Sequence, residues 1–113
     1  MILLSMDLNN LKLLNDSQGH AAGDKALATV SQEMLKSFSK YAKIYRTGGD
    51  EFMAIFRRSN LQTVQNYIQN FQNSLKKTEY RVACGAAEHF RHVKNILGSK
   101  GDVSSVPVVL QPE

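Results

Sequence analysis

The sequence predicts a single α+β domain built on an antiparallel sheet with helices on one face. Three observations support this fold class. The chain has 113 residues, enough to bury one hydrophobic core and too few for two ordinary domains. Short apolar runs that are typical of strands alternate with segments whose apolar residues recur at helical spacing. The predicted order is strand, helix, strand, strand, helix, strand, which is the ferredoxin-like βαββαβ plan.

The first predicted strand ends near an aspartate. Ile2–Leu4 is an apolar run that leads to Asp7, so we expect a buried strand with a carboxylate at its C-terminal end. Leu11, Leu13 and Leu14 then indicate a short helix. From about residue 23 to 40, one apolar face predicts a long amphipathic helix. This face comprises Ala26, Leu27, Val30, Met34, Leu35 and Phe38.

The middle of the chain predicts a hairpin followed by a helix and a strand. The runs at 43–46 and 52–56 are the hairpin strands, and we expect Gly48 and Gly49 to supply the positive φ that a tight turn requires. Ser59 or Asn60 can cap the next helix, and residues 80–86 return to a strand. The helix is expected to bury Leu61, Val64, Ile68, Phe71 and Leu75.

The last part of the chain is less regular. Apolar residues between 90 and 97 indicate a weak short helix, and from Gly98 onward Gly, Ser and Pro interrupt the pattern. Only Val106–Leu110 can add a short edge strand. We therefore assign residues 1–97 to the domain and residues 98–113 to an irregular C-terminal tail.

Composition excludes several classes of protein. Cys84 is the only cysteine, so no internal disulfide can form, a reducing cytoplasmic compartment is expected, and Cys84 is interpreted as a small core residue. No apolar run approaches the roughly 18 residues of a membrane span. The net charge of +4 permits a phosphate-bearing ligand without requiring one, because the basic residues are scattered. Nucleic-acid-binding motifs are missing, and no nucleic-acid partner is expected.

Three carboxylates are expected at one edge of the sheet. A right-handed crossover places the end of the first strand beside the tip of the hairpin, which brings Asp7 near Asp50 and Glu51. Carboxylate oxygens suit a hard cation such as Mg²⁺ (or Mn²⁺), and such ions can promote in-line displacement at phosphorus. The residues thus indicate phosphoryl or nucleotidyl transfer on a nucleoside triphosphate. The alternative is a solvated hairpin tip with Asp7 as a helix cap.

Two motifs point to a known family. Residues 48–52 spell GGDEF, and residues 7–16 with Gly19–His20 and Gly23–Asp24 follow the pattern D-x-[DN]-x-[FL]-K-x-x-N-D…G-H-x-x-G-D. With both motifs in this order, the chain resembles the GGDEF family of diguanylate cyclases. The resemblance covers residues 2–58 by motif and 60–87 by pattern. It implies the nucleotidyl cyclase and polymerase-palm version of the ferredoxin-like fold.

The resemblance also implies roles for individual residues. Asp7, Asp50 and Glu51, with the backbone carbonyl of Leu8, would hold the metal. Asp50 and Glu51 would be catalytic, with Glu51 orienting or deprotonating the attacking 3′-hydroxyl. The substrate-binding residues would be Asn15 and Asp24 at the guanine edge, the backbone N–H groups of Asn9, Asn10 and Leu11 at the phosphates, Gly48 and Gly49 as space for the substrate, and Lys12, unless that lysine is simply solvated.

The implied reaction joins two GTP molecules into cyclic di-GMP and releases two pyrophosphates. Because each subunit holds one GTP, a homodimer is implied, and a sensory domain or another partner could control it. The chain departs from the family pattern at three places. Residues 39–42 lack the RxxD product-inhibition motif, the chain opens at the first strand, and the late basic helix has no clear counterpart, although Arg91 and Lys94 could substitute. The alternative is therefore a catalytically inactive GTP-binding or protein-interaction module.

Overall fold

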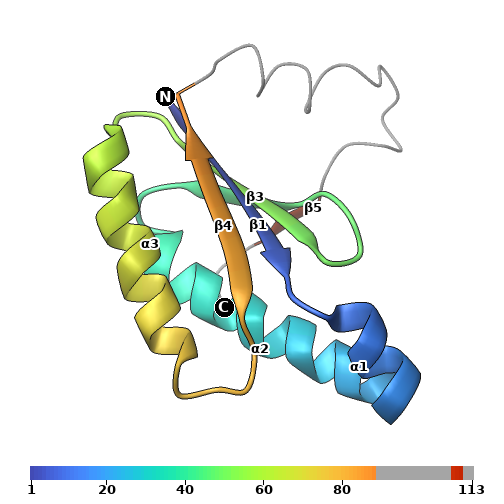
Figure 1. Cartoon of the computed structure of the whole chain (residues 1–113). Coiled ribbons are helices and arrows are strands. Elements are labelled where there is room, and N and C mark those ends of the chain that lie inside the picture. Colours follow the sequence, from blue (N-terminus) through green and yellow to red (C-terminus); the bar gives the residue numbers. More distant parts are fainter. Residues whose placement is uncertain (89–107, 111–113) are drawn as a thin grey trace.

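The structure, a computed structural model, describes residues 1–88 and 108–110. Its element order confirms the predicted α+β plan, including both the short helix and the long helix expected between the first two strands (Figure 1). The elements are β1 (Ile2–Leu8), α1 (Leu11–Gln18), α2 (His20–Phe38), β2 (Lys43–Arg46), β3 (Glu51–Phe56), α3 (Leu61–Leu75), β4 (Val82–Ala87) and β5 (Val108–Leu110). The strands form one sheet in the order β4-β1-β3-β2-β5.

The central strand β1 sets the position of the site residues. It pairs antiparallel with β3 on one side and with β4 on the other. Its even-numbered residues from Ile2 to Leu8 are buried against the helices, whereas Asp7 projects from the opposite face. The β1–β3 register makes Asp7 the partner of Glu51. The sheet register thus brings together residues that lie far apart in the sequence.

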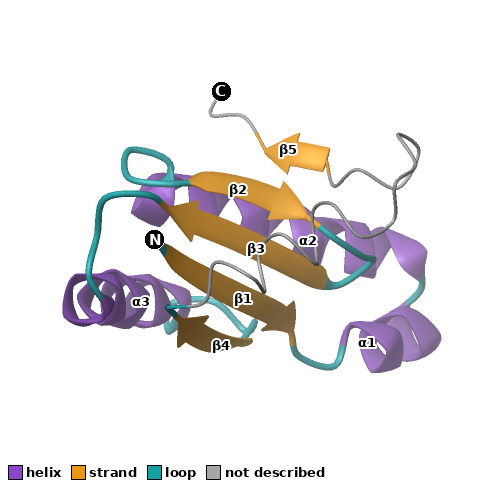
Figure 2. Ribbon diagram, turned by 90° about the horizontal axis from the view of Figure 1, so that it is seen from above, coloured by secondary structure: helices purple, strands orange, loops and turns teal. Residues whose placement is uncertain are grey.

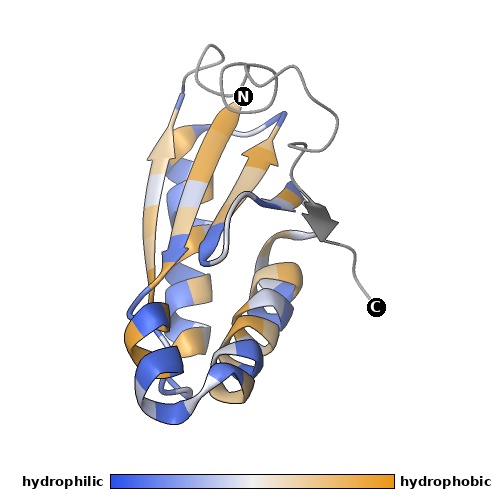
Figure 3. Cartoon of the chain, turned by 90° about the vertical axis from the view of Figure 1, so that its right-hand side faces the viewer, coloured by the Kyte–Doolittle hydropathy of each residue, from blue (hydrophilic) through white to orange (hydrophobic). Residues whose placement is uncertain are grey.

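Helices α2 and α3 cover one face of the sheet, as Figure 2 shows. The core between them contains the phenylalanines of α2, β3 and α3: Phe38 lies 5.9 Å from Phe56 and 5.1 Å from Phe71 between ring centroids. The apolar faces predicted for both helices are confirmed, since every one of their residues is buried or packed against this core. Figure 3 shows strands that are mostly apolar and helices in which apolar and polar residues alternate.

A second, smaller apolar cluster lies on the other face of the sheet. It consists of Leu3, Met53 and Ile55, with Tyr45 packed against them. Neighbouring positions of β3 are therefore buried on both faces, and the strand has a continuous apolar run from Phe52 to Phe56. We did not predict this second cluster from the sequence.

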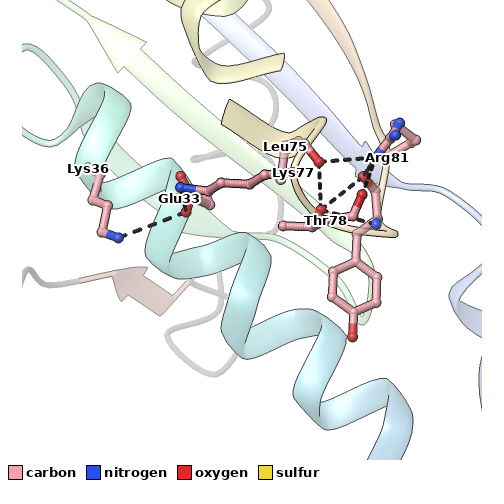
Figure 4. Close-up of polar contacts among 7 residues, drawn as sticks. Glu33, Lys36, Leu75, Lys77, Thr78 and Arg81 are labelled. Carbon is pink, nitrogen blue, oxygen red and sulfur yellow. Dashed lines mark hydrogen bonds and ion pairs between the residues drawn. The ribbon is translucent and has the colours of Figure 1, made fainter. Parts of the chain in front are cut away.

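The ends of α3 are held by specific hydrogen bonds. Asn60 is the N-cap, because its side-chain oxygen accepts a hydrogen bond from the Thr63 N–H at 2.8 Å. Beyond the helix, Arg81 Nη1 donates to the carbonyls of Leu75, Thr78 and Tyr80 at 3.0, 2.7 and 2.6 Å (Figure 4). This arginine satisfies carbonyl groups where the helix ends and the chain turns into β4.

Helix α2 begins earlier than predicted, at His20 instead of about residue 23. Gly19 has a φ of 88° and its carbonyl accepts from the N–H groups of Ala22 and Gly23 at 3.2 and 3.4 Å. Glycine adopts positive φ readily, so the chain reverses at Gly19 and the next helix starts immediately. Gly23 consequently lies inside α2, although a glycine usually weakens a helix interior.

Much of the tail lies outside the described residues. The helix predicted within 90–97 also lies outside the described residues, as do Arg91 and Lys94. The described part of the tail, β5, pairs antiparallel with β2, with Leu110 opposite Ile44. In the portion of the chain that the structure describes, no helix combines the length and apolar character needed to cross a bilayer.

Candidate active site

Asp7 and Asp50 are the carboxylates that the structure brings together. The Leu8 N–H donates to the backbone carbonyl of Asp50 at 2.9 Å, which joins the end of β1 to the loop before β3. Partial burial, the nearby Asp50 carboxylate and a hydrogen bond with it raise the pKa of Asp7 above its ordinary value. Two like charges side by side are unfavourable, and a bound cation would relieve their repulsion.

Glu51 lies next to this pair, but its carboxylate lies beside the loop at Gly48. As the cross-strand partner of Asp7, it projects from the same face of the sheet. Its Oε2 lies 3.4 Å from the position that a Cβ on Gly48 would occupy, so its carboxylate is beside the loop. Within the described residues, no group of three or more His, Cys, Asp or Glu side chains is arranged to hold a metal. The structure thus pairs Asp7 with Asp50 and places Glu51 beside them, and the role of Glu51 at the metal stays a prediction.

The two carboxylates that meet still fit the predicted cation. Mg²⁺ usually binds through one or two carboxylates and completes its shell with water and substrate phosphates. Asp7 and Asp50 supply two such groups, and the repulsion that raises the pKa of Asp7 would be offset by the positive charge. The donor set is therefore consistent with a hard divalent cation.

Arg46 closes the loop between β2 and β3. Its Nε donates to the Gly48 carbonyl at 3.1 Å and its Nη2 donates to the Gly49 carbonyl at 2.8 Å. Gly19 is the only described glycine with positive φ, so the prediction of positive φ at Gly48 and Gly49 is wrong. A loop of residues 47–50 does not need the mirror-image turn of a two-residue hairpin, and the guanidinium bridges its carbonyls instead. We had not singled out Arg46 from the sequence.

The turn between β1 and α1 only partly fits the predicted phosphate cradle. Asn10 has φ 61° and ψ 26°, a left-handed conformation that asparagine tolerates better than most residues. The Asn9 N–H already donates to the Arg81 carbonyl at 2.9 Å, because the β1–β4 pairing extends into the turn. The N–H groups of Asn10 and Leu11 are left as candidates for phosphate binding. Lys12 is exposed nearby, and its role stays a prediction.

Asn15 and Asp24 lie where α1 and α2 pack together. Asn15 is half-buried on α1, and its Oδ1 is buried without a hydrogen-bond partner. An unpaired buried acceptor costs about 1–3 kcal/mol, so such atoms are rare in folded proteins. Asp24 is exposed on α2, directly after Gly23. An unpaired amide oxygen and an exposed carboxylate both accept hydrogen bonds, so they fit a ligand that offers donors, as the guanine edge does.

Two cavities flank the strands at opposite ends. One of about 280 Å³ lies between the β1–α1 turn and the α3–β4 loop, and its lining includes Asn9, Asn10 and Tyr80. A larger one of about 390 Å³ lies at the far end of β2 and β3, where Lys43 and Arg57 contribute to its wall. None of the three site carboxylates lines either cavity, but the smaller cavity is bordered by Asn9 and Asn10, which follow β1 directly. The smaller cavity is therefore the nearer of the two to the candidate site.

Cys84 has the properties of a packing residue. It lies in β4, is half-buried, and packs against the main core. Burial raises the pKa of its thiol to about 11, so the nucleophilic thiolate is scarce at neutral pH. This environment agrees with the interpretation of Cys84 as a small core residue.

Comparisons with known proteins agree on one family. The model of the diguanylate cyclase GGDEF domain matches residues 1–98. The diguanylate cyclase DgcZ of Escherichia coli is 35% identical over 60 residues, covering 53% of this chain and 20% of that protein. An uncharacterised membrane protein of Staphylococcus haemolyticus is 28% identical over 82 residues, covering 73% of this chain and 23% of that protein. The chain thus spans about a fifth of the length of these curated relatives.

Solved structures share the fold. The GGDEF domain of DgcB from Caulobacter crescentus, in complex with c-di-GMP, has a TM-score of 0.73 at 23% identity, covering 78% of this chain and 58% of that one. Diguanylate cyclase SiaD from Pseudomonas aeruginosa, in complex with its activator SiaC, has a TM-score of 0.72 at 21% identity, covering 88% and 46%. With the motifs, the fold and the family match in agreement, the chain belongs to the GGDEF domain family of diguanylate cyclases.

Proposed function

We propose that this domain is a metal-dependent diguanylate cyclase, which joins two GTP molecules into cyclic di-GMP. The observation that carries the proposal is the Asp7–Asp50 pair at the end of β1, beside the glycine loop of a GGDEF-family chain. Nucleotidyl transfer needs positive charge at the phosphates, and this pair is a site where a cation would be stabilised. We place the reaction in the cytoplasm, where GTP is available.

Asp7 and Asp50 would hold Mg²⁺ or Mn²⁺, with Glu51 and the Leu8 carbonyl as further ligands. The bound cation would stabilise negative charge on the reacting phosphate and the leaving pyrophosphate. The protein keeps the two aspartates together through the hydrogen bond from the Leu8 N–H to the Asp50 carbonyl. Asp50 is thereby tied to β1 by its backbone, which limits how far its carboxylate can move from Asp7.

Glu51 would act on the nucleophile. It projects from the same face as Asp7, at the start of β3, and its carboxylate lies beside Gly48. In the proposed step Glu51 accepts the proton of a 3′-hydroxyl, whose oxygen forms a bond to the α-phosphorus of the other GTP while the bond to pyrophosphate breaks. Two such steps close the ring and release two pyrophosphates. The reaction requires two GTP-loaded subunits facing each other, hence a homodimer that can be transient.

Asn15 and Asp24 would select guanine. Asn15 presents an amide with an unpaired buried oxygen, and Asp24 adds an exposed carboxylate one residue after Gly23. If these side chains hydrogen-bond to guanine, their polar atoms would be left unpaired when adenine is bound. The affinity for adenine nucleotides would therefore be lower. The N–H groups of Asn10 and Leu11 would bind the phosphates, with Gly48 and Gly49 leaving space for the substrate.

The direct test is turnover of GTP by the full chain. The protein is incubated with GTP and Mg²⁺ or Mn²⁺ over a range of protein concentrations, and the products are separated by chromatography and identified by mass. We expect cyclic di-GMP and pyrophosphate, with a rate that rises more steeply than protein concentration because a dimer is needed. Asp50→Asn should reduce the rate roughly 10²-fold or more. Glu88→Gln, a matched change at an exposed carboxylate, should not.

The possible outcomes separate the alternatives. Product formation by the wild type and Glu88→Gln but not by Asp50→Asn supports the cyclase. GTP binding without product at any concentration supports the alternative, a catalytically inactive GTP-binding module. Equal product from Asp50→Asn and the wild type would contradict the role of Asp50. A chain that neither binds nor converts GTP would contradict the cyclase and the GTP-binding module, and would leave the protein-interaction module as the alternative.

A further inference from the structure

Gly23 lies against the side chain of Asn15. A Cβ on Gly23 would overlap Asn15 Oδ1, and it would lie 2.7 Å from Asn15 Cγ and 3.1 Å from Asn15 Nδ2. The contacts with Oδ1 and Cγ are closer than real Cβ contacts allow, so no side chain at position 23 is compatible with the present position of the Asn15 amide. Gly23 is buried inside α2, a place where glycine itself is unfavourable. The structure therefore keeps a helix-weakening residue at the point where the Asn15 amide packs.

The contact involves the flexible end of a side chain. All three close atoms belong to the Asn15 amide, which can rotate away, so a methyl group at position 23 would displace this amide and not the backbone of α2. Such a displacement would also release a buried oxygen that has no partner. The unpaired buried oxygen of Asn15 and the glycine inside α2 are both unfavourable for folding, which suggests that the position of the amide has a function.

We propose that Gly23 determines nucleobase specificity by positioning Asn15. Without a Cβ, position 23 lets the Asn15 amide pack against α2 at Gly23, the residue before Asp24, and in this proposal both side chains address one edge of a bound guanine. The inference rests on the proposed role of Asn15 and Asp24 in guanine recognition. It adds that the position of the amide is set by the absence of a side chain on α2.

If Gly23 had a purely structural role, a methyl group at this position would change stability and base preference differently from what the proposal predicts. If Gly23 served only the packing of α1 on α2, a methyl group would separate the helices. Stability would then fall, and all nucleotides would bind more weakly by the same factor. If Gly23 acts through Asn15, the methyl group should leave stability unchanged or raise it, since alanine favours a helix. Discrimination between bases would be lost selectively.

The test compares Gly23→Ala with the wild type by nucleotide affinity and thermal unfolding. The ligands are α,β-methylene analogues of GTP, ITP and ATP, which cannot release pyrophosphate; ITP lacks only the 2-amino donor of guanine. We expect the wild type to prefer the GTP analogue. In Gly23→Ala, that preference should narrow by roughly fivefold or more. Its Tm should be equal to or higher than that of the wild type.

Two further variants provide controls. Gly85→Ala is a matched glycine change on β4, where a Cβ would meet Ser5 Oγ at an ordinary 3.9 Å, and it should keep the base preference. Asn15→Ala should itself narrow the preference. Adding Gly23→Ala to Asn15→Ala should cause no further narrowing, because the two changes act through the same amide.

A wild type that prefers the GTP analogue, together with a Gly23→Ala variant of unchanged preference, overturns this inference alone. A lower Tm with equal weakening for all three analogues also overturns it and assigns Gly23 to packing. A wild type that binds none of the analogues, or binds them equally, overturns guanine recognition and with it this inference.

Discussion

Two carboxylates in this domain, Glu33 and Asp7, have opposite electrostatic environments. Glu33 on α2 is only 6% exposed, and its Oε1 lies 3.3 Å from Lys77 Nζ and 3.8 Å from Lys36 Nζ (Figure 4). Asp7 on β1 is exposed and lies beside Asp50, among the described residues it forms no ion pair with a basic side chain, and its pKa is raised. The buried charge is paired and the exposed charge is repelled. The ion pairs of Glu33 stabilise the helix layer, whereas the Asp7–Asp50 pair at the sheet edge would be stabilised by a bound cation.

Hydrogen-bonding groups show a similar contrast. At the two ends of α3, Arg81 donates to three carbonyls and Asn60 caps the helix. Where α1 packs on α2, Asn15 Oδ1 is buried and unpaired, and the helix-weakening Gly23 lies inside α2. Unfavourable interactions that persist in a folded protein are typical of functional sites, where a ligand supplies what the chain lacks. The comparison thus separates residues that hold the fold from residues that serve the site.

The largest expected effect is on the helix layer. Phe38→Ala removes a fully buried ring that contacts Phe56 and Phe71, so the free energy of unfolding should fall by about 3–5 kcal/mol. That is a large part of the stability of a small domain. Urea denaturation measures it. Leu13→Ala, at a position that is 65% exposed, should change stability by less than about 0.5 kcal/mol.

The next prediction concerns two arginines that each bind loop carbonyls. Arg46→Gln loses two hydrogen bonds to the glycine loop and Arg81→Gln loses three at the end of α3. Each should cost about 1 kcal/mol of stability. Only Arg46→Gln should also lower kcat for cyclic di-GMP formation, because it loosens the loop that carries Asp50 and Glu51.

Arg46→Lys sharpens this comparison. A lysine keeps the charge but offers no planar fork to reach both carbonyls, so it should restore kcat only in small part. Thermal unfolding and steady-state kinetics on the same preparations measure the two effects. An Arg81→Gln variant with the same loss of kcat as Arg46→Gln would show that loop tethering is not the cause.

A smaller effect is expected at Glu33. Glu33→Gln removes the attraction to Lys77 and Lys36, and we expect a loss of about 1 kcal/mol in the free energy of unfolding. Because both lysines are exposed, the loss should shrink at high salt. Denaturation at low and high ionic strength measures this dependence. A variant as stable as the wild type at low salt would contradict a stabilising role for the pairing.

The smallest effect, of opposite sign, is expected at Asp7. Its pKa is higher in the folded state than its ordinary value, so folding binds protons as the pH falls through that range. Ionised Asp7 therefore destabilises the fold at neutral pH, and this contribution disappears on acidification. Asp7→Asn should slightly raise the Tm at neutral pH, with the difference from the wild type vanishing towards acid pH. Mg²⁺ should raise the Tm of the wild type but not of the variant.

Measuring the Tm of both proteins against pH, with and without Mg²⁺, checks this prediction. The Asp7→Asn and Glu33→Gln results belong together, since one carboxylate is predicted to oppose folding and the other to support it. If both substitutions destabilise the fold to a similar extent, the contrast between the sheet edge and the helix layer is wrong.

Local patterns in the sequence were sufficient for most of the fold. Apolar residues at helical spacing identified the buried faces of α2 and α3, because the period of a helix is a property of the chain itself. Ser59 or Asn60 was expected to cap α3, and Asn60 does so. The apolar face predicts a start at about residue 23, but α2 begins at His20, and Gly23 lies inside the helix despite the cost of a glycine there.

Interactions between distant segments could not be predicted in the same way. An arginine two residues before Gly48 is visible in the sequence. Nothing in the local sequence, however, shows that its side chain hydrogen-bonds to the carbonyls of the glycine loop. The Asn9 N–H was assigned to phosphate binding, yet the extension of the β1–β4 pairing engages it with the Arg81 carbonyl. Both depend on where the loop and strand backbones lie.

The sequence by itself determined the order of the elements, the buried faces of the helices and the presence of carboxylates at one sheet edge. Only the tertiary structure decided that Asp7 meets Asp50 while Glu51 lies beside Gly48, and that the Asn15 amide rests on Gly23. The physical reason is that periodicity and residue type act within a segment. Contact between side chains depends on strand register and on the packing of α1 against α2, which differences of an ångström can change.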